Sequence, residues 1–356
     1  MTPRTQIRFW LVGFAVFIAL IYVLRPILLP FVAGMAAAYF LDPIVDRLER
    51  LKLARSLATA LVTVVFFLIA GGLIALLVPL VQAQVIDFAA NIPGYAEGLR
   101  ERLKPLVETL LANLRPEDVE HLKVSAENYA GTAVSWAVTA LADILSGGMA
   151  VISILSLLLI TPVVTFYLLR DWDKMTTRID NWLPRDHAPI IRAQLERIDS
   201  TLAGFVRGQG LVCVVLAAYY GIALSLANLE LGLVVGVLTG VATVIPYLGG
   251  FAGMLVGVGL ALAQFSDWMP VALVAAIFIV GQIAEGYVLT PNLVGDRIML
   301  HPVWIPFALL AGGALFGFLG VLLAVPVAAV IGVLIRFSLE RYLASPLYKG
   351  THSPEP

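Results

Sequence analysis

The stretch that decides the fold is 231–266, which reads LGLVVGVLTGVATVIPYLGGFAGMLVGVGLALAQFS. It contains no Asp, Glu, Lys or Arg, and its centre is broken by Pro246, Tyr247, Leu248, Gly249 and Gly250. Each half holds about 15 residues, or about 22 Å of helix, whereas a bilayer core is about 30 Å thick. We therefore predict a helical hairpin that enters the membrane and returns to the same side.

A second run, 303–335, has the same form and is broken at Gly317-Phe318-Leu319-Gly320. It predicts a second re-entrant hairpin, again with two arms of about 15 residues. Backbone turns at membrane depth persist only where protein buries them or where they line a cavity. The two tips are therefore candidate functional positions.

The composition places the whole chain in a membrane. Of its 356 residues, 60% are hydrophobic and 13% are charged, against about 45–50% and about 25% in soluble proteins. The apolar runs are continuous, which favours helices over barrel strands. They are 9–41, 57–83, 148–169, 209–229, 231–266, 268–289 and 303–335. We predict an all-α polytopic membrane protein, which excludes a soluble enzyme, a nucleic-acid binder and a disordered chain.

The first run is too long for one span, and Arg25-Pro26 divides it into helices near 9–24 and 27–41. A cleaved signal peptide is the alternative for 9–24, but no small-residue cleavage site follows. A cytoplasmic N-terminus places 17 of the 23 Lys and Arg residues inside, as the positive-inside rule requires. The hairpins then enter from opposite faces, and both termini are cytoplasmic.

The predicted organisation has six parts. They are N-terminal membrane helices in 1–83, an extracytoplasmic helical insertion in 84–147, a membrane helix in 148–169, a cytoplasmic amphipathic helical segment in 170–208, a transport core in 209–340 and a disordered tail in 341–356. The insertion serves either packing and oligomer contact or a solute gate. The cytoplasmic segment serves either topology and lipid contact or partner docking.

Glu285 is the one acidic or basic residue within the runs from 57–83 onward. An ionisable group inside a membrane is costly and is a functional candidate by default. Gln282 lies three residues earlier on the same helix face, and Asn292 follows. We predict that these three residues couple protons or ions. The alternative is that Glu285 reaches the interface or pairs with Arg297.

The uncharged tips suit a small polar solute that bears hydroxyl groups, because glycine lets a ligand approach the backbone. The predicted solute-binding residues are Pro246, Tyr247, Gly249, Gly250, Gly312, Gly313, Gly317 and Gly320. The alternative, which can hold together with solute binding, is tight helix packing. Two glycine series have the four-residue spacing of membrane helix contacts, Gly232, Gly236 and Gly240 and then Gly249, Gly253 and Gly257.

The chain has no G-x-S-x-G, H-E-x-x-H or P-loop pattern. Its single cysteine and four scattered histidines favour neither a disulfide nor a metal site. We expect no enzyme activity, no cofactor, no metal and no nucleic-acid partner.

Residues 285–326 read EGYVLTPNLVGDRIMLHPVWIPFALLAGGALFGFLGVLLAVP. This stretch resembles the signature of the autoinducer-2 exporter family of bacterial membrane proteins. The matching positions are Glu285, Pro291, Gly295, His301, Pro302, Gly312, Gly313, Gly317, Gly320 and Pro326. Further matches are 245–249, 207–209 and 166–171, so that the resemblance covers roughly 9–340. Gly250 departs from it, because relatives often have proline there.

The resemblance implies export of small signalling or metabolic solutes, with autoinducer-2 as the name-giving substrate, across the bacterial inner membrane. It also implies homo-oligomers, described as pentamers, and hairpins that move by an elevator mechanism. Some relatives are described as Na⁺(Li⁺)/H⁺ antiporters, which is the alternative function. A third hypothesis is a scaffold that transports nothing and binds partners through 84–147 and 170–208.

Overall fold

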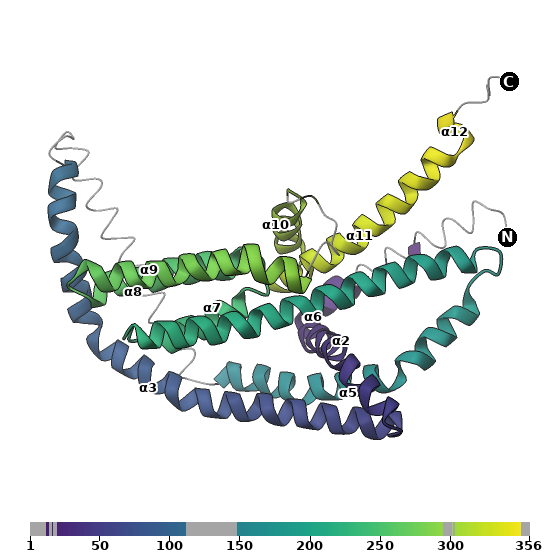
Figure 1. Ribbon diagram of the computed structural model, residues 1–356, viewed down its shortest axis with the longest axis horizontal. Coiled ribbons are helices and arrows are strands. Elements are labelled where there is room, and N and C mark those ends of the chain that lie inside the picture. Colours follow the sequence, from purple (N-terminus) through teal and green to yellow (C-terminus); the bar gives the residue numbers. More distant parts are fainter. Residues whose placement is uncertain are drawn as a thin grey trace. The chain divides into compact units, whose positions relative to one another are not determined.

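The computed structural model describes residues 12–13, 16, 20–111, 148–294, 301 and 303–349, and the regular elements in this part are helices (Figure 1). The chain divides into two compact units. The first unit comprises Met1–Phe67, Ser156–Gly210 and Pro291–Pro356, and the second comprises Leu68–Leu155 and Leu211–Thr290.

Helices α3 (Arg55–Leu111), α5 (Gly148–Trp182) and α6 (Ala188–Leu226) contribute residues to both units. The other elements of the first unit are η1 (Arg25–Ile27), α2 (Leu28–Arg50), α10 (Trp304–Phe316), α11 (Phe318–Ala344) and α12 (Pro346–Lys349). The second unit contains α7 (Gly232–Ala242), α8 (Leu248–Gln264), α9 (Trp268–Ile283) and most of the π-helix η2 (Ala284–Val294).

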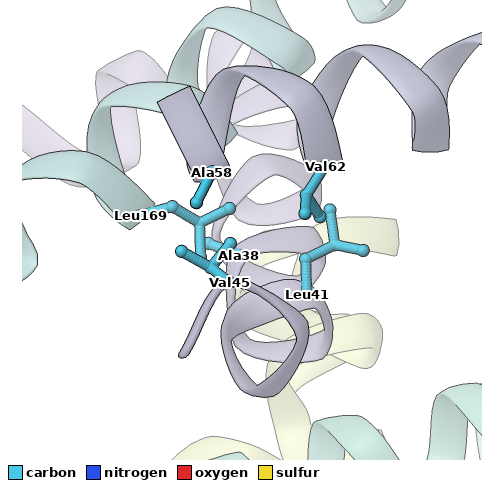
Figure 2. Close-up of a cluster of buried hydrophobic side chains, with 6 residues drawn as sticks. All are labelled: Ala38, Leu41, Val45, Ala58, Val62 and Leu169. Atoms are coloured by element: carbon cyan, nitrogen blue, oxygen red, sulfur yellow. The ribbon is translucent and has the colours of Figure 1, made fainter. Parts of the chain in front are cut away.

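An apolar cluster holds α2, α3 and α5 together in the first unit. Figure 2 shows its six buried side chains, which are Ala38, Leu41, Val45, Ala58, Val62 and Leu169. Helices α2 and α5 are also joined one turn before this cluster, where the Oγ1 of Thr165 donates to the carbonyl of Gly34 at 3.1 Å. Gly34 also lies directly against Val164. A side chain at position 34 would therefore separate the two helices.

Five helical stretches of the described chain are long and apolar enough to cross a membrane. They are Leu28–Arg50, Arg55–Gln84, Ala188–Leu226, Trp268–Val294 and Phe318–Ala344. Their large apolar side chains are widely exposed, which suits lipid contact rather than water. The all-α, multi-span prediction is confirmed. The predicted break in the first hairpin is also present, since α7 ends at Ala242 and α8 begins at Leu248.

The second hairpin differs from the prediction. Its first arm, α10, has 13 residues, but α11 has 27 and is itself of spanning length. The expectation of two arms of about 15 residues was therefore wrong for this arm. The apolar run stops before Arg336, yet helical hydrogen bonding continues through the polar residues that follow.

Two other helices also run past the end of their apolar stretches. The predicted helix 27–41 continues as α2 to Arg50, and the predicted span 57–83 continues as α3 to Leu111, inside the predicted insertion. In each case a charged or polar residue marks the end of the apolar run and not the end of the helix. Residues 112–147 of the predicted insertion lie outside the described residues. So do the residues of the predicted tail that follow Lys349.

Candidate functional site

Glycines on α7 press this helix against α6 in the second unit. A Cβ at Gly232 would meet the backbone of Leu224, one at Gly236 the backbone of Tyr220 and Gly221, and one at Gly240 the backbone of Ala217. The packing alternative predicted for these three glycines is confirmed. This seam fixes the short arm α7 on the long helix α6 (Figure 1).

The tip of the first hairpin closes on itself through two threonines. Gly249 lies against the backbone of Thr243, and Gly253 lies against the side chain of Thr239. The buried Oγ1 of Thr243 donates to the carbonyls of Thr239 and Gly240, at 3.0 and 2.6 Å. These bonds satisfy the Thr243 hydroxyl, which would otherwise be costly to bury. The backbone of the tip is therefore held in one arrangement.

Tyr247 opens α8 with a backbone that an L-residue rarely adopts, at φ 68° and ψ −30°. Its side chain is 63% exposed within the structure. Strained backbone of this kind persists only where the surroundings enforce it, and it clusters at functional positions. Tyr247 therefore presents an aromatic ring and a hydroxyl at the outer surface of the tip.

The tip meets α9 where sequence analysis placed the coupling residues. A Cβ at Gly250 would lie 3.1 Å from both the Cδ and the Oε1 of Gln282. The predicted solute-contacting glycine and the predicted coupling amide are thus in contact. Two turns further along α8 the same pattern recurs, because Gly257 lies against the ring of Phe278.

Glu285 is the second residue of η2, the π-helix that continues α9. π-Helical segments are rare and occur often at functional sites. Pro291 lies inside η2 and has no N–H to donate, so that one carbonyl of an earlier turn loses its helical partner. Within the described residues, the half-buried Glu285 carboxylate accepts no hydrogen bond and makes no ion pair.

The remaining motif residues belong to the first unit. Pro291 and Asn292 lie in the last turn of η2, and Pro326 lies inside α11. The Nδ1 of His301 accepts a hydrogen bond from the backbone N–H of Val303 at 3.4 Å, just before α10. Gly295 and Pro302, like Arg297, lie outside the described residues. The structural roles expected of these residues stay predictions.

At the second predicted tip, the arms α10 and α11 approach each other closely through their glycines. Gly312 and Gly320 lie so close that a Cβ on either one would overlap the carbonyl of the other. A Cβ at Gly313 would lie 3.0 Å from the side chain of Val321. Gly317 makes the turn itself, with φ 63° and ψ −141°. These glycines explain how the two arms approach, and their contact with a solute stays a prediction.

A polar cluster in the first unit, between α2, α5 and α6, was not predicted from the sequence. The Arg207 guanidinium donates to the carbonyl of Tyr39 at 2.8 Å and to the carboxylate of Asp42 at 3.3 Å. The hydroxyl of Tyr39 donates to Asp199 at 2.9 Å. These side chains and Trp172 line a cavity of about 50 Å³.

The one signal for that cluster in the sequence is the motif Arg207-Gly208-Gln209. Gly208 fits it, because a Cβ there would overlap the backbone of Leu293 in η2. The motif therefore joins α6 to α2 through Arg207 and to η2 through Gly208. Among the described residues, no three His, Cys, Asp or Glu side chains gather closely enough to hold a metal ion.

Comparison with known protein families identifies the wider group. The model of the AI-2E family transporter matches residues 11–340, which is nearly the whole chain. This chain belongs to the AI-2E transporter family. The resemblance noted in residues 285–326 is thereby confirmed, and the protein is a membrane transporter by family.

Curated relatives in the AI-2E family carry transport names. The chain is 30% identical over 316 residues to "Putative transport protein YrrI" of Bacillus subtilis (strain 168), with 88% of this chain and 87% of the relative covered. It is 28% identical over 333 residues to "Putative transport protein YueF" of the same strain, covering 92% and 86%. It is 26% identical over 317 residues to "Putative permease PerM" of Escherichia coli (strain K12), covering 89% of each.

Proposed function

We propose that this protein is a secondary transporter that exports a small polar solute resembling autoinducer-2 across the bacterial inner membrane. The solute is held at the hairpin tips, and Glu285 couples its movement to a proton gradient. Gln282 orients the solute beside Glu285, and Asn292 is the third residue proposed for the coupling. The AI-2E family membership supports transport, and the family name supplies the solute class.

One observation carries this proposal. In the second unit, the amide of Gln282 touches Gly250 at the hairpin tip, and Glu285 follows one turn later on a π-helix. A flexible amide donor and acceptor beside a bare backbone is a suitable site for hydroxyl groups. A half-buried carboxylate without a partner in the described chain is suited to exchanging a proton.

The proposal includes an arrangement in the membrane. Both termini are cytoplasmic, the two hairpins enter from opposite faces, and the first hairpin does not span fully. The short helix α7, with 11 residues, supports this for the first hairpin, because about 16 Å of helix cannot cross the bilayer core. We further propose a homo-oligomer, a pentamer by family resemblance, in which the hairpins move by an elevator mechanism.

The alternative cargo is Na⁺ or Li⁺ in exchange for H⁺. The observation that favours it is the same π-helix, because a carboxylate and the carbonyl that Pro291 leaves without a helical partner are oxygen ligands of the kind that hard cations prefer. On this alternative, Glu285 binds the cation and the proton in turn.

The test uses inside-out vesicles containing the purified protein. With an imposed proton gradient, we expect autoinducer-2 to accumulate, and we expect no accumulation in vesicles without the protein. In parallel, added Na⁺ or Li⁺ is tested for collapse of the gradient in the absence of solute. Collapse by the cation without accumulation of solute would replace the exporter with the antiporter. Neither response, in protein shown to be folded, would reject both.

A further inference from the structure

Tyr220 on α6 is fully buried within the second unit. Its ring stacks on Phe278 of α9, with the ring centroids 5.1 Å apart and the planes 29° apart. Its hydroxyl is pressed against Gly281, the residue of α9 that lacks a side chain at this point. The ring is therefore an ordinary core contact, and the hydroxyl is the part that needs an explanation.

The hydroxyl of Tyr220 has no hydrogen-bond partner in the described chain. The neighbouring tyrosine shows the usual solution, because the hydroxyl of Tyr219 donates to the carbonyl of Ile277 at 3.1 Å. Leaving a buried hydroxyl unpaired costs stability, and a phenylalanine at position 220 would keep the stacking without that cost. The conformation described here is thus one in which Tyr220 carries an unused donor.

An unused acceptor lies nearby. Glu285 is four residues beyond Gly281 along the same helical path, about one turn from the point that the Tyr220 hydroxyl touches. Its carboxylate accepts no hydrogen bond within the described residues. Within the second unit, the other titratable side chains of α6 are Cys213 and Tyr219, and Gln282 lies one turn before Glu285 on its own helix. Helices α7 and α8 carry no titratable side chain between Gly232 and Gln264 except Tyr247.

The π-helix provides the movement that would join them. Glu285 follows the point where α9 changes from the α to the π pattern of hydrogen bonds. A change of one bond in η2 from the π to the α pattern turns the Glu285 side chain about the helix axis. Tyr220 stays in place during this change, because its ring is stacked on Phe278. Gly281 has no side chain that would stand between the Tyr220 hydroxyl and the next turn of the helix.

We propose that Tyr220 is a positioning residue for Glu285. Its hydroxyl donates a hydrogen bond to the Glu285 carboxylate when that group is charged, and it releases the group when a proton or a cation is bound. The assignment rests on the proposed function in one respect, which is the coupling role of Glu285. The described conformation then corresponds to the released arrangement, with the donor and the acceptor apart.

The experiment measures thermal unfolding of the purified protein in lipid nanodiscs from pH 4 to pH 9. The variants are Tyr220→Phe, Glu285→Gln and the two together, with Tyr219→Phe as the matched control. We expect Tyr220→Phe to lower Tm by about 3 °C at the high end of this range, where the bond to the carboxylate is lost. At the low end we expect a Tm equal to or above that of the wild type, because only an unpaired hydroxyl is removed.

The controls separate this role from packing. Tyr219→Phe loses a bond to a backbone carbonyl, so that its effect on Tm should be the same at every pH. The pH dependence of Tyr220→Phe should vanish in the Glu285→Gln background. A difference between Tyr220→Phe and wild type that is constant from pH 4 to pH 9, or one that survives Glu285→Gln, would overturn the proposal.

Because thermal unfolding is measured without any cargo, the result for Tyr220 does not depend on whether the proposed transport function is correct. Coupling between Tyr220 and Glu285 without any transport would leave the proton-dependent pair in place and reject the exporter. Transport without this coupling would keep the exporter and reject the role of Tyr220. In transporting vesicles, Tyr220→Phe should also move the pH of half-maximal uptake, whereas Tyr219→Phe should not.

Discussion

Gly250 and Gln282 are in contact, so that a single methyl group at position 250 would lie 3.1 Å from the Cδ of the glutamine. The contact joins the tip of the first hairpin to the helix that carries Glu285. The neighbour at this glycine is a flexible side chain and not a backbone. Crowding here should therefore change the orientation of the amide before it changes the fold.

Gly250→Ala should lower the rate of solute uptake several-fold while leaving Tm within about 2 °C of the wild type. The methyl group displaces the Gln282 amide by a few tenths of an ångström, which is enough to misplace a hydrogen-bonding group. Gly259→Ala is the matched control, because it lies on the same helix with open space around its Cβ. Equal uptake by the two variants would show that the contact has no role in transport.

Gly240→Ala should destabilise the protein by about 3 kcal/mol, because the added methyl group overlaps the backbone of Ala217 and forces α7 away from α6. Chemical or thermal unfolding of the purified variant measures this. Gly259→Ala again serves for comparison and should be neutral or slightly stabilising, since alanine favours the helix. Similar unfolding curves for both variants would contradict the close α6–α7 seam.

Gly317→Ala should cost about 1–3 kcal/mol for backbone reasons alone. The backbone at this position has φ 63° and ψ −141°, while no atom lies within 4 Å of an added Cβ. Gly72→Ala adds a methyl group in equally open space within the regular helix α3, and it should not destabilise. If both variants unfold alike, the turn between α10 and α11 has another conformation.

Tyr39→Phe should lower the stability of the first unit by about 1–2 kcal/mol, because Asp199 loses a hydrogen bond that it accepts at 2.9 Å. Arg207→Lys should have a similar effect, since lysine cannot donate to both the Tyr39 carbonyl and the Asp42 carboxylate in the same geometry. Lys174→Gln, which changes an exposed pair, is the control. Unfolding of the three variants at equal denaturant concentrations would disprove a structural role for the cluster.

The turn between α5 and α6 should loosen in acid. The Nε and Nη2 of Arg192 donate to the two carboxylate oxygens of Asp180, with Nη2 to Oδ2 at 2.8 Å. These hydrogen bonds hold the pKa of the Asp180 carboxyl below its ordinary value. A carboxyl whose pKa is lower in the folded state than in the unfolded state stabilises the fold at any pH above its unfolded pKa, which is about 4. This stabilisation is lost as the pH falls through the pKa of the folded state.

Hydrogen exchange of residues 183–187 measures this loosening. Exchange corrected for its intrinsic pH dependence should be slow at pH 6 and faster below about pH 4. In the Asp180→Asn variant, these amides should exchange fast at both pH values. A turn equally protected across this range in the wild type would show that the pair contributes nothing.

Sequence reasoning predicted the breaks in the chain and missed the lengths of the helices. Proline and glycine interrupt helical hydrogen bonding locally, so that the tips near Pro246 and Gly317 could be placed from the sequence. The ends of α2, α3 and α11 could not, because helical pairing continues through polar residues. The continuation of α9 as a π-helix also left no pattern in the sequence.

The sequence was sufficient to predict which residues belong to the candidate site, but not which of them are in contact. Gln282 and Gly250 were selected separately, one for its spacing from Glu285 and the other for its place in a break. Their contact depends on how α8 packs on α9. The bond of Tyr39 to Asp199 joins residues 160 positions apart, and the unpaired hydroxyl of Tyr220 is visible only once its surroundings are known. Neither leaves a local signal in the sequence.

The central claim is that Glu285, beside the first hairpin tip, couples solute movement to the proton gradient. The most direct measurement compares gradient-driven uptake of autoinducer-2 by Glu285→Gln and Asp267→Asn in inside-out vesicles with matched protein content. Asp267 precedes the same helix at its opposite end. We predict that Glu285→Gln abolishes gradient-driven uptake and that Asp267→Asn transports as the wild type does. Unchanged gradient-driven uptake by folded Glu285→Gln protein would contradict the account.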